Sequence, residues 1–164
     1  AYSLAMALRE SQDLASGPRR AVQIYATDLN PAAITLARKG WYSAAALASV
    51  SPERRERFFI PKDGGYTVHP DIRSMVMFAQ HDVIVDPPFT QLDLLMCRNV
   101  LIYFDNPTKQ RVLANVLRAL RPGGWLILGH CESLQGLQVP VDTLRPSIYR
   151  KPAMDKRAFT RIAS

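Results

Sequence analysis

The sequence predicts an α/β fold with a parallel sheet, and one βαβ pattern in the second half of the chain supports this most directly. The apolar run at residues 92–97 is cut off abruptly by polar residues, which indicates a buried strand. Residues 106–120 place apolar side chains on one helical face, with Asn106 as the N-cap and Pro107 at the first helical position. After a Pro-Gly-Gly break, residues 125–129 indicate a second buried strand. A strand, a crossover helix and a strand in this order describe a parallel βαβ unit.

The composition fits one domain with a substantial core. The chain has 164 residues, of which 48% are hydrophobic. It contains neither an apolar run long enough to span a membrane nor a basic-then-apolar leader, so we expect a cytoplasmic location. Cys97 and Cys131 both adjoin predicted strands and have no second Cys or His at ligand spacing. We therefore expect buried free thiols and no metal site.

The chain is basic, with a net charge of +7 and a pI near 9.8. The basic residues are dispersed, and no aromatic residues interleave with them as a base-stacking platform requires. We therefore expect no nucleic-acid partner. A solvated basic surface and attraction to an acidic protein substrate fit the charge equally well.

The first part of the chain continues the α/β pattern. Residues 2–10 have apolar side chains on one helical face, and residues 22–27 indicate a strand that ends at Asp28. Residues 31–39 form a short amphipathic pattern that Gly40 ends.

Asp28 is the first candidate binding residue. A carboxylate at the tip of the second strand of a Rossmann-like sheet is placed to accept hydrogen bonds from ribose hydroxyls. The alternative is that Asp28, or Asn30 just after it, caps the following helix, with Pro31 in its first turn.

The pattern changes between residues 41 and 73, where we expect a small antiparallel β-subdomain. Ser51-Pro52 indicates a helix start, and two short β runs flank the turn residues 63–65. An Asp-Gly turn between two such runs predicts a hairpin. A further strand is expected at residues 74–79.

The loop at residues 86–89 reads Asp-Pro-Pro-Phe, the signature of adenine-N6 methyltransferases that cradle a flipped base. Here it precedes the strand at residues 92–97, whereas in those enzymes it follows the corresponding strand. Two consecutive prolines are explained by a rigid loop, so we reject the nucleic-acid interpretation.

At the other end of the chain, residues 143–150 suggest a final hairpin, and residues 151–164 suggest a basic tail or linker.

Several stretches resemble known proteins. LRPGG followed by WLIL resembles the later half of class I methyltransferases that use S-adenosylmethionine, and CRNVLIYF resembles the CheR family of chemoreceptor glutamate O-methyltransferases. YSLAMAL, IYATDLN, FAQHDVIVDPPF and GHCES agree with that family in order. The resemblance runs from Tyr2 to about Arg150, and it is closest to CheR domains in CheB–CheR fusion proteins.

The resemblance implies a Rossmann-like class I methyltransferase fold over residues 1–150, with the insert at 41–73 as a small β-subdomain. It also implies S-adenosylmethionine as cofactor and glutamate side chains of chemoreceptors as substrate. The family's glycine-rich motif I precedes the Tyr-Ser pair that begins this resemblance, so the sheet is expected to be incomplete at its N-terminal strand. A fragment without that motif is expected to have little activity, and its exposed sheet edge could drive self-association.

The resemblance further assigns site residues. It places Asp82 and Val83 beside the adenine, where family members carry Asn and Leu; Asp82 can accept a hydrogen bond but cannot donate one as Asn can. It places Arg98 and Asn99 beside the cofactor, and Tyr103 near the reactive methyl group. Arg98 could also hold the substrate carboxylate in a bidentate grip, so Arg98 and Tyr103 are the candidate catalytic residues.

Arg98 and Tyr103 each have a structural alternative. Arg98 could form a salt bridge with Asp93 or Asp105, and Tyr103 could pack in the core with Phe104. For the whole chain, a non-catalytic signalling module that binds S-adenosylmethionine or a partner is the second hypothesis, and a small-molecule or RNA methyltransferase is the third. A glutamate carboxylate is already ionised at neutral pH and needs no strong general base, which agrees with a site of Arg, Asn and Tyr.

Overall fold

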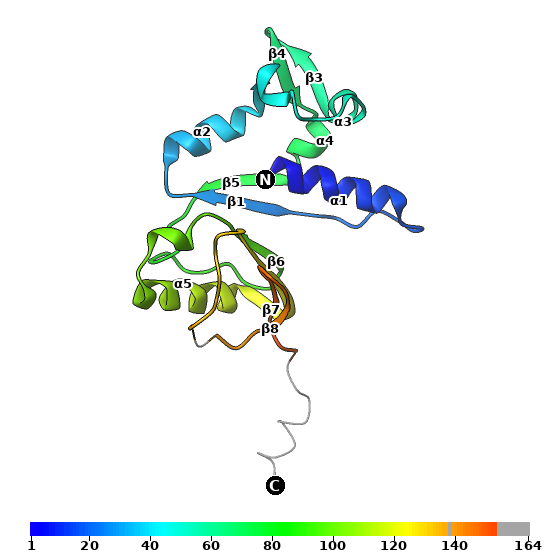
Figure 1. Cartoon of the computed structure of the whole chain (residues 1–164). Helices are drawn as coiled ribbons and strands as arrows, with labels where there is room; N and C mark the ends of the chain where they lie inside the picture. The colour runs from blue at the N-terminus through cyan, green and yellow to red at the C-terminus, as the bar shows by residue number, and fades with distance from the viewer. Residues whose placement is uncertain (138, 154–164) are drawn as a thin grey trace. The chain divides into compact units, whose positions relative to one another are not determined.

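The computed structural model describes residues 1–137 and 139–153. These residues form two compact units, a first unit of residues 1–81 and a second unit that begins at Asp82. The first unit contains two sheets and the second contains one, and each unit has its own buried cluster of apolar side chains (Figure 1).

The first unit contains a parallel pair of strands, β1 (Ile24–Asp28) and β5 (Val76–Gln80), paired in register from Ile24 opposite Val76 to Asp28 opposite Gln80. Helix α1 (Tyr2–Leu14) extends one turn further than residues 2–10, because Ser11, Gln12 and Asp13 continue the helix without a break. Its buried face belongs to the core of this unit. The predicted strand, helix and strand are thus confirmed, with shifts of about two residues at the strand ends.

Helix α2 (Pro31–Lys39) starts and ends as its sequence predicts. Asn30 is the N-cap, and its side chain accepts hydrogen bonds from the backbone N–H groups of Ala32 and Ala33. Gly40 ends the helix in the left-handed conformation, with φ of 61°. The helix therefore begins directly behind the carboxyl end of β1, where Asp28 lies.

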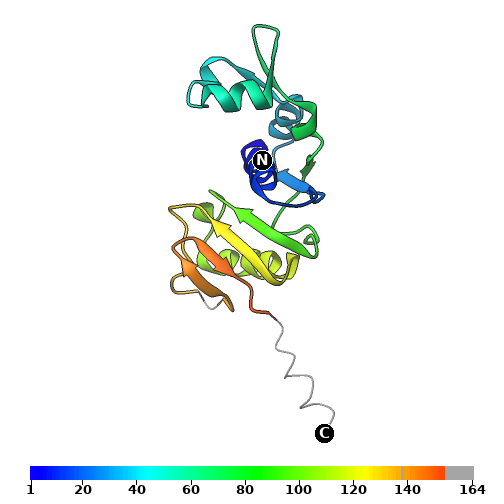
Figure 2. The ribbon, with the colours of Figure 1, turned by 90° about the vertical axis from the view of Figure 1, so that its right-hand side faces the viewer.

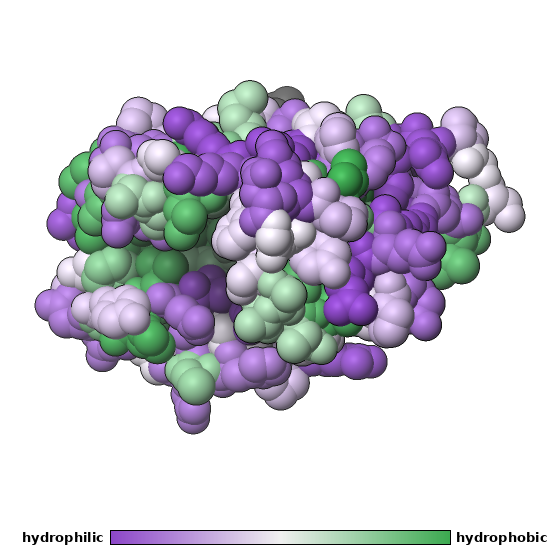
Figure 3. Space-filling model, turned by 90° about the horizontal axis from the view of Figure 1, so that it is seen from above, coloured by the Kyte–Doolittle hydropathy of each residue, from purple (hydrophilic) through white to green (hydrophobic). Residues whose placement is uncertain are grey.

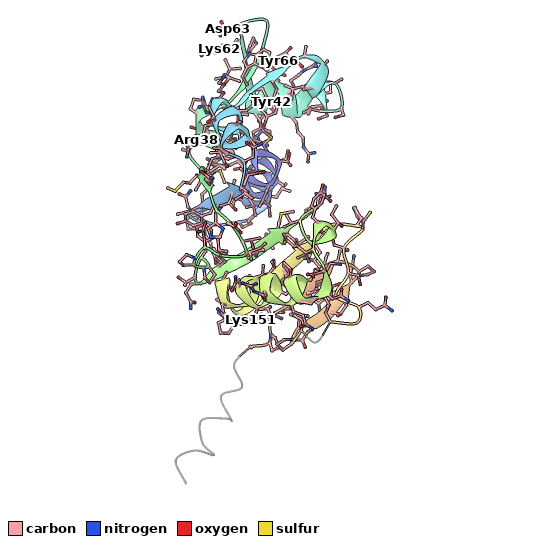
Figure 4. The ribbon with its side chains drawn as sticks, turned by 90° about the vertical axis from the view of Figure 1, so that its left-hand side faces the viewer. Arg38, Tyr42, Lys62, Asp63, Tyr66 and Lys151 are labelled. Carbon is pink, nitrogen blue, oxygen red and sulfur yellow. The ribbon has the colours of Figure 1, made fainter. Side chains whose placement is uncertain are left out.

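The insert forms a three-stranded antiparallel sheet in the order β2 (Trp41–Ser43), β4 (Gly65–Val68), β3 (Phe59–Lys62). Asp63 and Gly64 close the β3–β4 hairpin with positive φ angles of 49° and 70°, as a primed two-residue turn requires. Figure 4 shows Lys62 and Asp63 at the hairpin tip and Tyr42 and Tyr66 lower down, which face each other across β2 and β4. The hairpin is confirmed, and β2 adds a strand that the sequence had not predicted.

Two short helices flank this small sheet. Helix α3 (Pro52–Phe58) is capped by the Ser51 side chain, as expected, and α4 (Pro70–Arg73) follows β4. A 3₁₀ turn, η1 (Ala45–Leu47), lies between β2 and α3.

Ion pairs join α1 to α3 and to the loop after α1. The Arg54 guanidinium donates two hydrogen bonds of 2.8 Å to the Glu10 carboxylate, while Arg57 and Arg19 both form ion pairs with Asp13. Part of the basic charge is thus neutralised locally. Figure 3 shows hydrophilic and hydrophobic residues interspersed on the face seen there, with hydrophilic ones predominant on its right-hand side.

The second unit contains a four-stranded mixed sheet in the order β6 (Leu92–Cys97), β7 (Leu120–Leu128), β9 (Ile148–Arg150), β8 (Asp142–Arg145). Strands β6 and β7 are parallel and are joined by helix α5 (Asn106–Ala119), so the predicted βαβ unit is confirmed. The predicted final hairpin is β8–β9. Figure 2 shows the strands side by side with α5 along one face of the sheet.

The ends of α5 differ from the prediction. The N-cap is Asp105, whose side chain accepts the Thr108 N–H at 3.0 Å, so Asn106 is the first helical residue. At the other end β7 begins at Leu120, and the Arg-Pro-Gly-Gly stretch is an irregular part of that strand rather than a loop. The Lys151 ammonium donates 2.7 Å hydrogen bonds to the carbonyls of Leu117 and Leu120, which satisfies acceptors at the helix end (Figure 4).

The core of the second unit packs one face of α5 against the sheet. Val112, Leu113 and Val116 of the helix meet Leu126 and Tyr149 of the strands. Cys97 is buried in this cluster, as predicted. Cys131 is exposed, contrary to the prediction, because β7 ends three residues before it.

Of the tail expected at residues 151–164, only residues 151–153 lie within the described part. Lys151 continues the pairing beyond β9, since its backbone exchanges hydrogen bonds with Gly123 and Gly124. No helix among the described residues is long and apolar enough to cross a membrane.

Candidate functional site

Three candidate residues of the second unit, Arg98, Asn99 and Tyr103, lie just after the end of β6. Arg98 and Asn99 follow Cys97 directly, and a 3₁₀ turn, η2 (Leu101–Tyr103), follows them. Asn99 adopts a left-handed backbone conformation with φ of 58°, which Asn tolerates better than most residues. This reversal turns the chain away from the sheet and leaves the side chains of Arg98 and Asn99 exposed at the strand end.

A buried carboxylate fixes this reversal. Glu132 is only 5% exposed, and its oxygens accept four backbone N–H groups. Oε2 accepts from Asn99 at 2.9 Å and Gly129 at 2.7 Å, and Oε1 accepts from Val100 and Leu101 at 2.8 Å each. Burial raises the pKa of the Glu132 carboxyl, but the four N–H donors outweigh burial and leave the pKa below its ordinary value. The carboxylate is therefore ionised at neutral pH.

Gly129 provides the space for that contact. A Cβ atom at this position would lie 2.6 Å from Glu132 Oε2 and 3.1 Å from Asn99 Oδ1. Only glycine fits here without displacing the carboxylate or the Asn99 side chain. The Gly-His-Cys-Glu-Ser stretch thus contains two residues, Gly129 and Glu132, that shape the neighbouring strand end.

Sequence reasoning did not assign Glu132 a role. An acidic residue shortly after a strand resembles an ordinary loop residue, and its partners at 99–101 lie more than thirty residues earlier in the chain. The available signal was the glycine three residues before it, at the end of a buried strand. That glycine indicates a close approach by another group, without naming the group.

Arg98 lines a small pocket at the carboxyl ends of β6 and β7. Met96 and Ile127 form apolar parts of its wall, and His130 and Ser147 also line it. Neither predicted salt bridge forms among the described residues: Asp93 pairs with Arg121 at 2.6 Å, and the Asp105 side chain caps α5. The pocket therefore combines apolar lining residues with Arg98, which has no ion-pair partner in the described part of the chain.

Tyr103 is 78% exposed, so it does not pack in the core. Its neighbour Phe104 is half-buried and packs against the cluster around α5 instead. The alternative of a core role is thus excluded for Tyr103, and its phenol is available to a ligand.

Asp82 and Val83 lie in a turn that precedes β6. The Asp82 N–H donates to Asp86 Oδ2 at 2.7 Å, and Asp82 Oδ1 accepts the Ile84 N–H at 2.8 Å. The Val83 carbonyl accepts from the Asn115 side chain of α5 at 3.1 Å, and Val83 packs against the same core cluster as Val100. Asp86 therefore serves to hold the turn, in agreement with the rigid-loop interpretation.

Asp28 lies at the carboxyl end of β1 in the first unit. Its Oδ1 accepts the Asn30 N–H at 2.8 Å, while Asn30 itself caps α2. The capping alternative thus holds for Asn30, and Asp28 supports the cap residue. A carboxylate has two oxygens with about four acceptor sites, so this contact leaves Asp28 able to accept from a further donor.

Each polar candidate side chain, taken within its own unit, can form hydrogen bonds with a ligand. Asp28 and Asp82 offer carboxylate oxygens to hydroxyl or amino groups, and the exposed Asn99 amide can both donate and accept. Among the described residues there is no group of three His, Cys, Asp or Glu side chains that could hold a metal ion.

Known proteins resemble the chain as follows. Residues 1–149 match the family model described as CheR methyltransferase, SAM binding domain. Chemotaxis protein methyltransferase 1 of Pseudomonas aeruginosa is 40% identical over 140 residues, which cover 83% of this chain and 51% of that protein. An uncharacterized 104.1 kDa protein of Rhodobacter capsulatus is 40% identical over 138 residues, 84% of this chain and 14% of that protein.

The N-methyltransferase NodS from Bradyrhizobium japonicum, solved with S-adenosyl-L-homocysteine, matches with a TM-score of 0.39 and 20% identity over 65% of this chain and 40% of that one. The chain spans about half the length of the chemotaxis methyltransferase that it matches. Since the family model covers nearly the whole sequence, the chain belongs to the CheR methyltransferase family, as its S-adenosylmethionine-binding domain.

Proposed function

We propose that the protein to which this chain belongs transfers a methyl group from S-adenosylmethionine to glutamate carboxylates of chemoreceptor proteins. Membership of the CheR family and the chemotaxis methyltransferase relative support the cofactor and the signalling context. The observation that favours a carboxylate substrate is the pocket at the end of β6, where the Arg98 guanidinium has no ion-pair partner among the described residues. An unpaired guanidinium suits a carboxylate.

The chemistry of a carboxylate nucleophile agrees with the residues present. A glutamate side chain titrates near ~4.3, so its oxygen already carries the nucleophile's charge at neutral pH. The residues around Arg98 therefore need to align the carboxylate rather than remove a proton. S-adenosylmethionine, when bound, supplies the electrophilic methyl group.

Each candidate residue has a proposed role in this reaction. Asp28 accepts from the ribose hydroxyls, and Asp82 and Val83 contact the adenine. Asn99 binds the cofactor, and Arg98 orients the substrate carboxylate beside it. The exposed phenol of Tyr103 lies near the reacting methyl group.

The test is methyl transfer by the full-length protein. The protein is incubated with methyl-labelled S-adenosylmethionine and the cytoplasmic part of a chemoreceptor, and the label is then treated with mild base. A glutamate methyl ester releases its label as methanol, whereas N-methyl and nucleic-acid methyl groups keep theirs. We expect base-labile label on the receptor, and its loss when the receptor glutamates are replaced by alanine. Base-stable label, or label on RNA, would contradict the proposal.

Asp82 favours the second candidate, a signalling module that binds the cofactor without turning it over. Its carboxylate cannot donate to the adenine ring as an amide can, and one of its oxygens is already used by Ile84. The transfer experiment, together with a calorimetric titration with S-adenosylhomocysteine, decides between the two: binding with no transfer to any receptor would favour the module.

A further inference from the structure

We infer that Glu132 is a positioning residue for cofactor binding: its carboxylate sets the backbone at residues 99–101 and thereby the direction of the Asn99 side chain. This inference rests on the proposed function, because it assumes that Asn99 contacts the cofactor. Glu132 is itself buried and accepts hydrogen bonds from backbone N–H groups, so its effect on the ligand is indirect.

Glu132 connects two neighbouring strand ends. The Asn99, Val100 and Leu101 amides are consecutive and follow β6, while the Gly129 amide follows β7. One side chain thus fixes the turn after one parallel strand to the end of the next. In an open α/β sheet such strand ends form the ligand-binding edge. A shift of this turn would therefore displace the groups that contact the ligand.

The site requires a carboxylate. Glutamine would keep one acceptor oxygen and turn an NH₂ group towards either the Asn99 and Gly129 donors or the Val100 and Leu101 donors. Two hydrogen bonds would be lost, and the glutamine NH₂ group would face two backbone N–H groups, which are donors as well. The left-handed φ of 58° at Asn99 then loses the contacts that hold it.

A competing explanation is that Glu132 only stabilises the fold, like a core leucine. The two explanations differ in what happens to protein that is still folded. A stabilising residue changes the midpoint of thermal unfolding, Tm, and leaves the cofactor dissociation constant of folded molecules unchanged. A positioning residue changes that dissociation constant at temperatures where every molecule is folded.

The experiment is calorimetric titration of the full-length protein with S-adenosylhomocysteine, at a temperature where far-ultraviolet circular dichroism shows each variant fully folded. For Glu132→Gln we expect the dissociation constant to rise about tenfold or more, since hydrogen bonds to a charged group are lost. Glu56→Gln is the matched control, because Glu56 is exposed on α3. We expect it to stay within about twofold of the wild type.

A second variant covers the case in which Glu132→Gln fails to fold. Gly129 has no positive φ, so Gly129→Ala introduces no backbone strain; its Cβ would lie 2.6 Å from Glu132 Oε2, a closer contact than the 3.1 Å to Asn99 Oδ1. We expect the same weakening of binding from this variant. Wild-type affinity in folded Gly129→Ala would overturn the inference.

A double-mutant cycle with Asn99→Gly provides the sharpest test, because glycine removes the side chain and accepts the left-handed backbone. If Glu132 acts through Asn99, the double variant binds clearly more tightly than the product of the two single losses predicts. Strictly multiplicative losses, or a lowered Tm with unchanged affinity in Glu132→Gln, would overturn the positioning role while the proposed function stands. If the wild type itself does not bind S-adenosylhomocysteine, the proposed function fails, and this inference fails with it.

Discussion

The Asp86 carboxylate accepts the backbone N–H of Asp82 at 2.7 Å, so the first residue of the Asp-Pro-Pro-Phe loop secures the turn that presents Asp82 and Val83. The two prolines after Asp86 limit the conformations of this loop, and Asn115 of α5 holds the Val83 carbonyl. The turn is thus fixed from both sides before any ligand binds.

We predict from this that Asp86→Ala weakens the binding of S-adenosylhomocysteine by the full-length protein. Removing the acceptor leaves the Asp82 N–H without its partner, at a cost of about 1 kcal/mol, which corresponds to a roughly fivefold higher dissociation constant if the turn must re-form on binding. Calorimetric titration measures the change. Asp71→Ala on α4 is the control, since Asp71 is exposed; an equal effect from both variants would argue against a role for the turn.

Arg98→Lys is predicted to lower kcat for methyl transfer by about a hundredfold, because an ammonium cannot make the bidentate contact with a carboxylate. The Tm should change little, since Arg98 is exposed and forms no ion pair with Asp93 or Asp105. Steady-state kinetics with the receptor substrate provide the measurement. Arg121→Lys is the matched control, because Arg121 pairs with the exposed Asp93. Comparable kcat values for the two variants would remove Arg98 from the reaction.

The two cysteines should differ sharply in reactivity. Burial, and after it the charge of Glu132, raises the pKa of the Cys97 thiol to about 12, whereas Cys131 is exposed. At pH 8 a thiol reagent should therefore modify Cys131 in the folded protein and Cys97 only after unfolding. Mass spectrometry of the labelled peptides shows which cysteine is modified. Cys131→Ser should abolish the rapid labelling of the folded protein. Rapid labelling of Cys97 in folded protein would contradict its burial.

Glu132 should make stability depend on pH. Its pKa is lowered in the folded state, so the unfolded chain binds more protons as the pH falls through the unfolded value of about 4.3. Its contribution to the free energy of unfolding is thus complete above that pH and is lost as the pH falls further, through the folded value. Denaturant unfolding between pH 3 and about pH 7 should show the wild type losing more stability than Glu132→Gln. Parallel curves for the two proteins would mean that Glu132 is not ionised in the fold.

The fold was predictable to a large extent because its signals are local. The apolar run before Arg98 and the helical spacing from Val112 to Leu120 determine the βαβ unit without knowledge of distant contacts. Apart from the short elements β2 and α4, which were not predicted, the errors fall at element boundaries. Asp105 and Asn106 are both good N-caps, and the preference for Pro at the first helical position favoured Asn106; the structure instead uses Asp105, with Pro107 as the second helical residue.

The candidate site was less predictable because it depends on contacts between distant residues. Cys131 is exposed because β7 ends at Leu128, and a strand end is not visible in the sequence to that accuracy. Glu132 is buried because amides from two separate segments converge on it, which no spacing rule anticipates. The individual positions of Arg98, Asn99 and Tyr103 followed from the family resemblance, whereas the group that holds their backbone did not.

The left-handed backbone at Asn99 also limits how a mutational scan of this position should be interpreted. Most replacements would have two effects: they remove the side-chain amide, and they place at a φ of 58° a residue that is strained there, most of all a β-branched or bulky one. Their loss of activity would therefore overstate the importance of the side chain. Glycine alone separates the two effects, since it removes the amide and adopts the same backbone angle freely. The tolerance profile at position 99 is thus set by conformation as much as by chemistry, and a library restricted to Asn, Asp and Gly would be more informative there than one of all twenty residues.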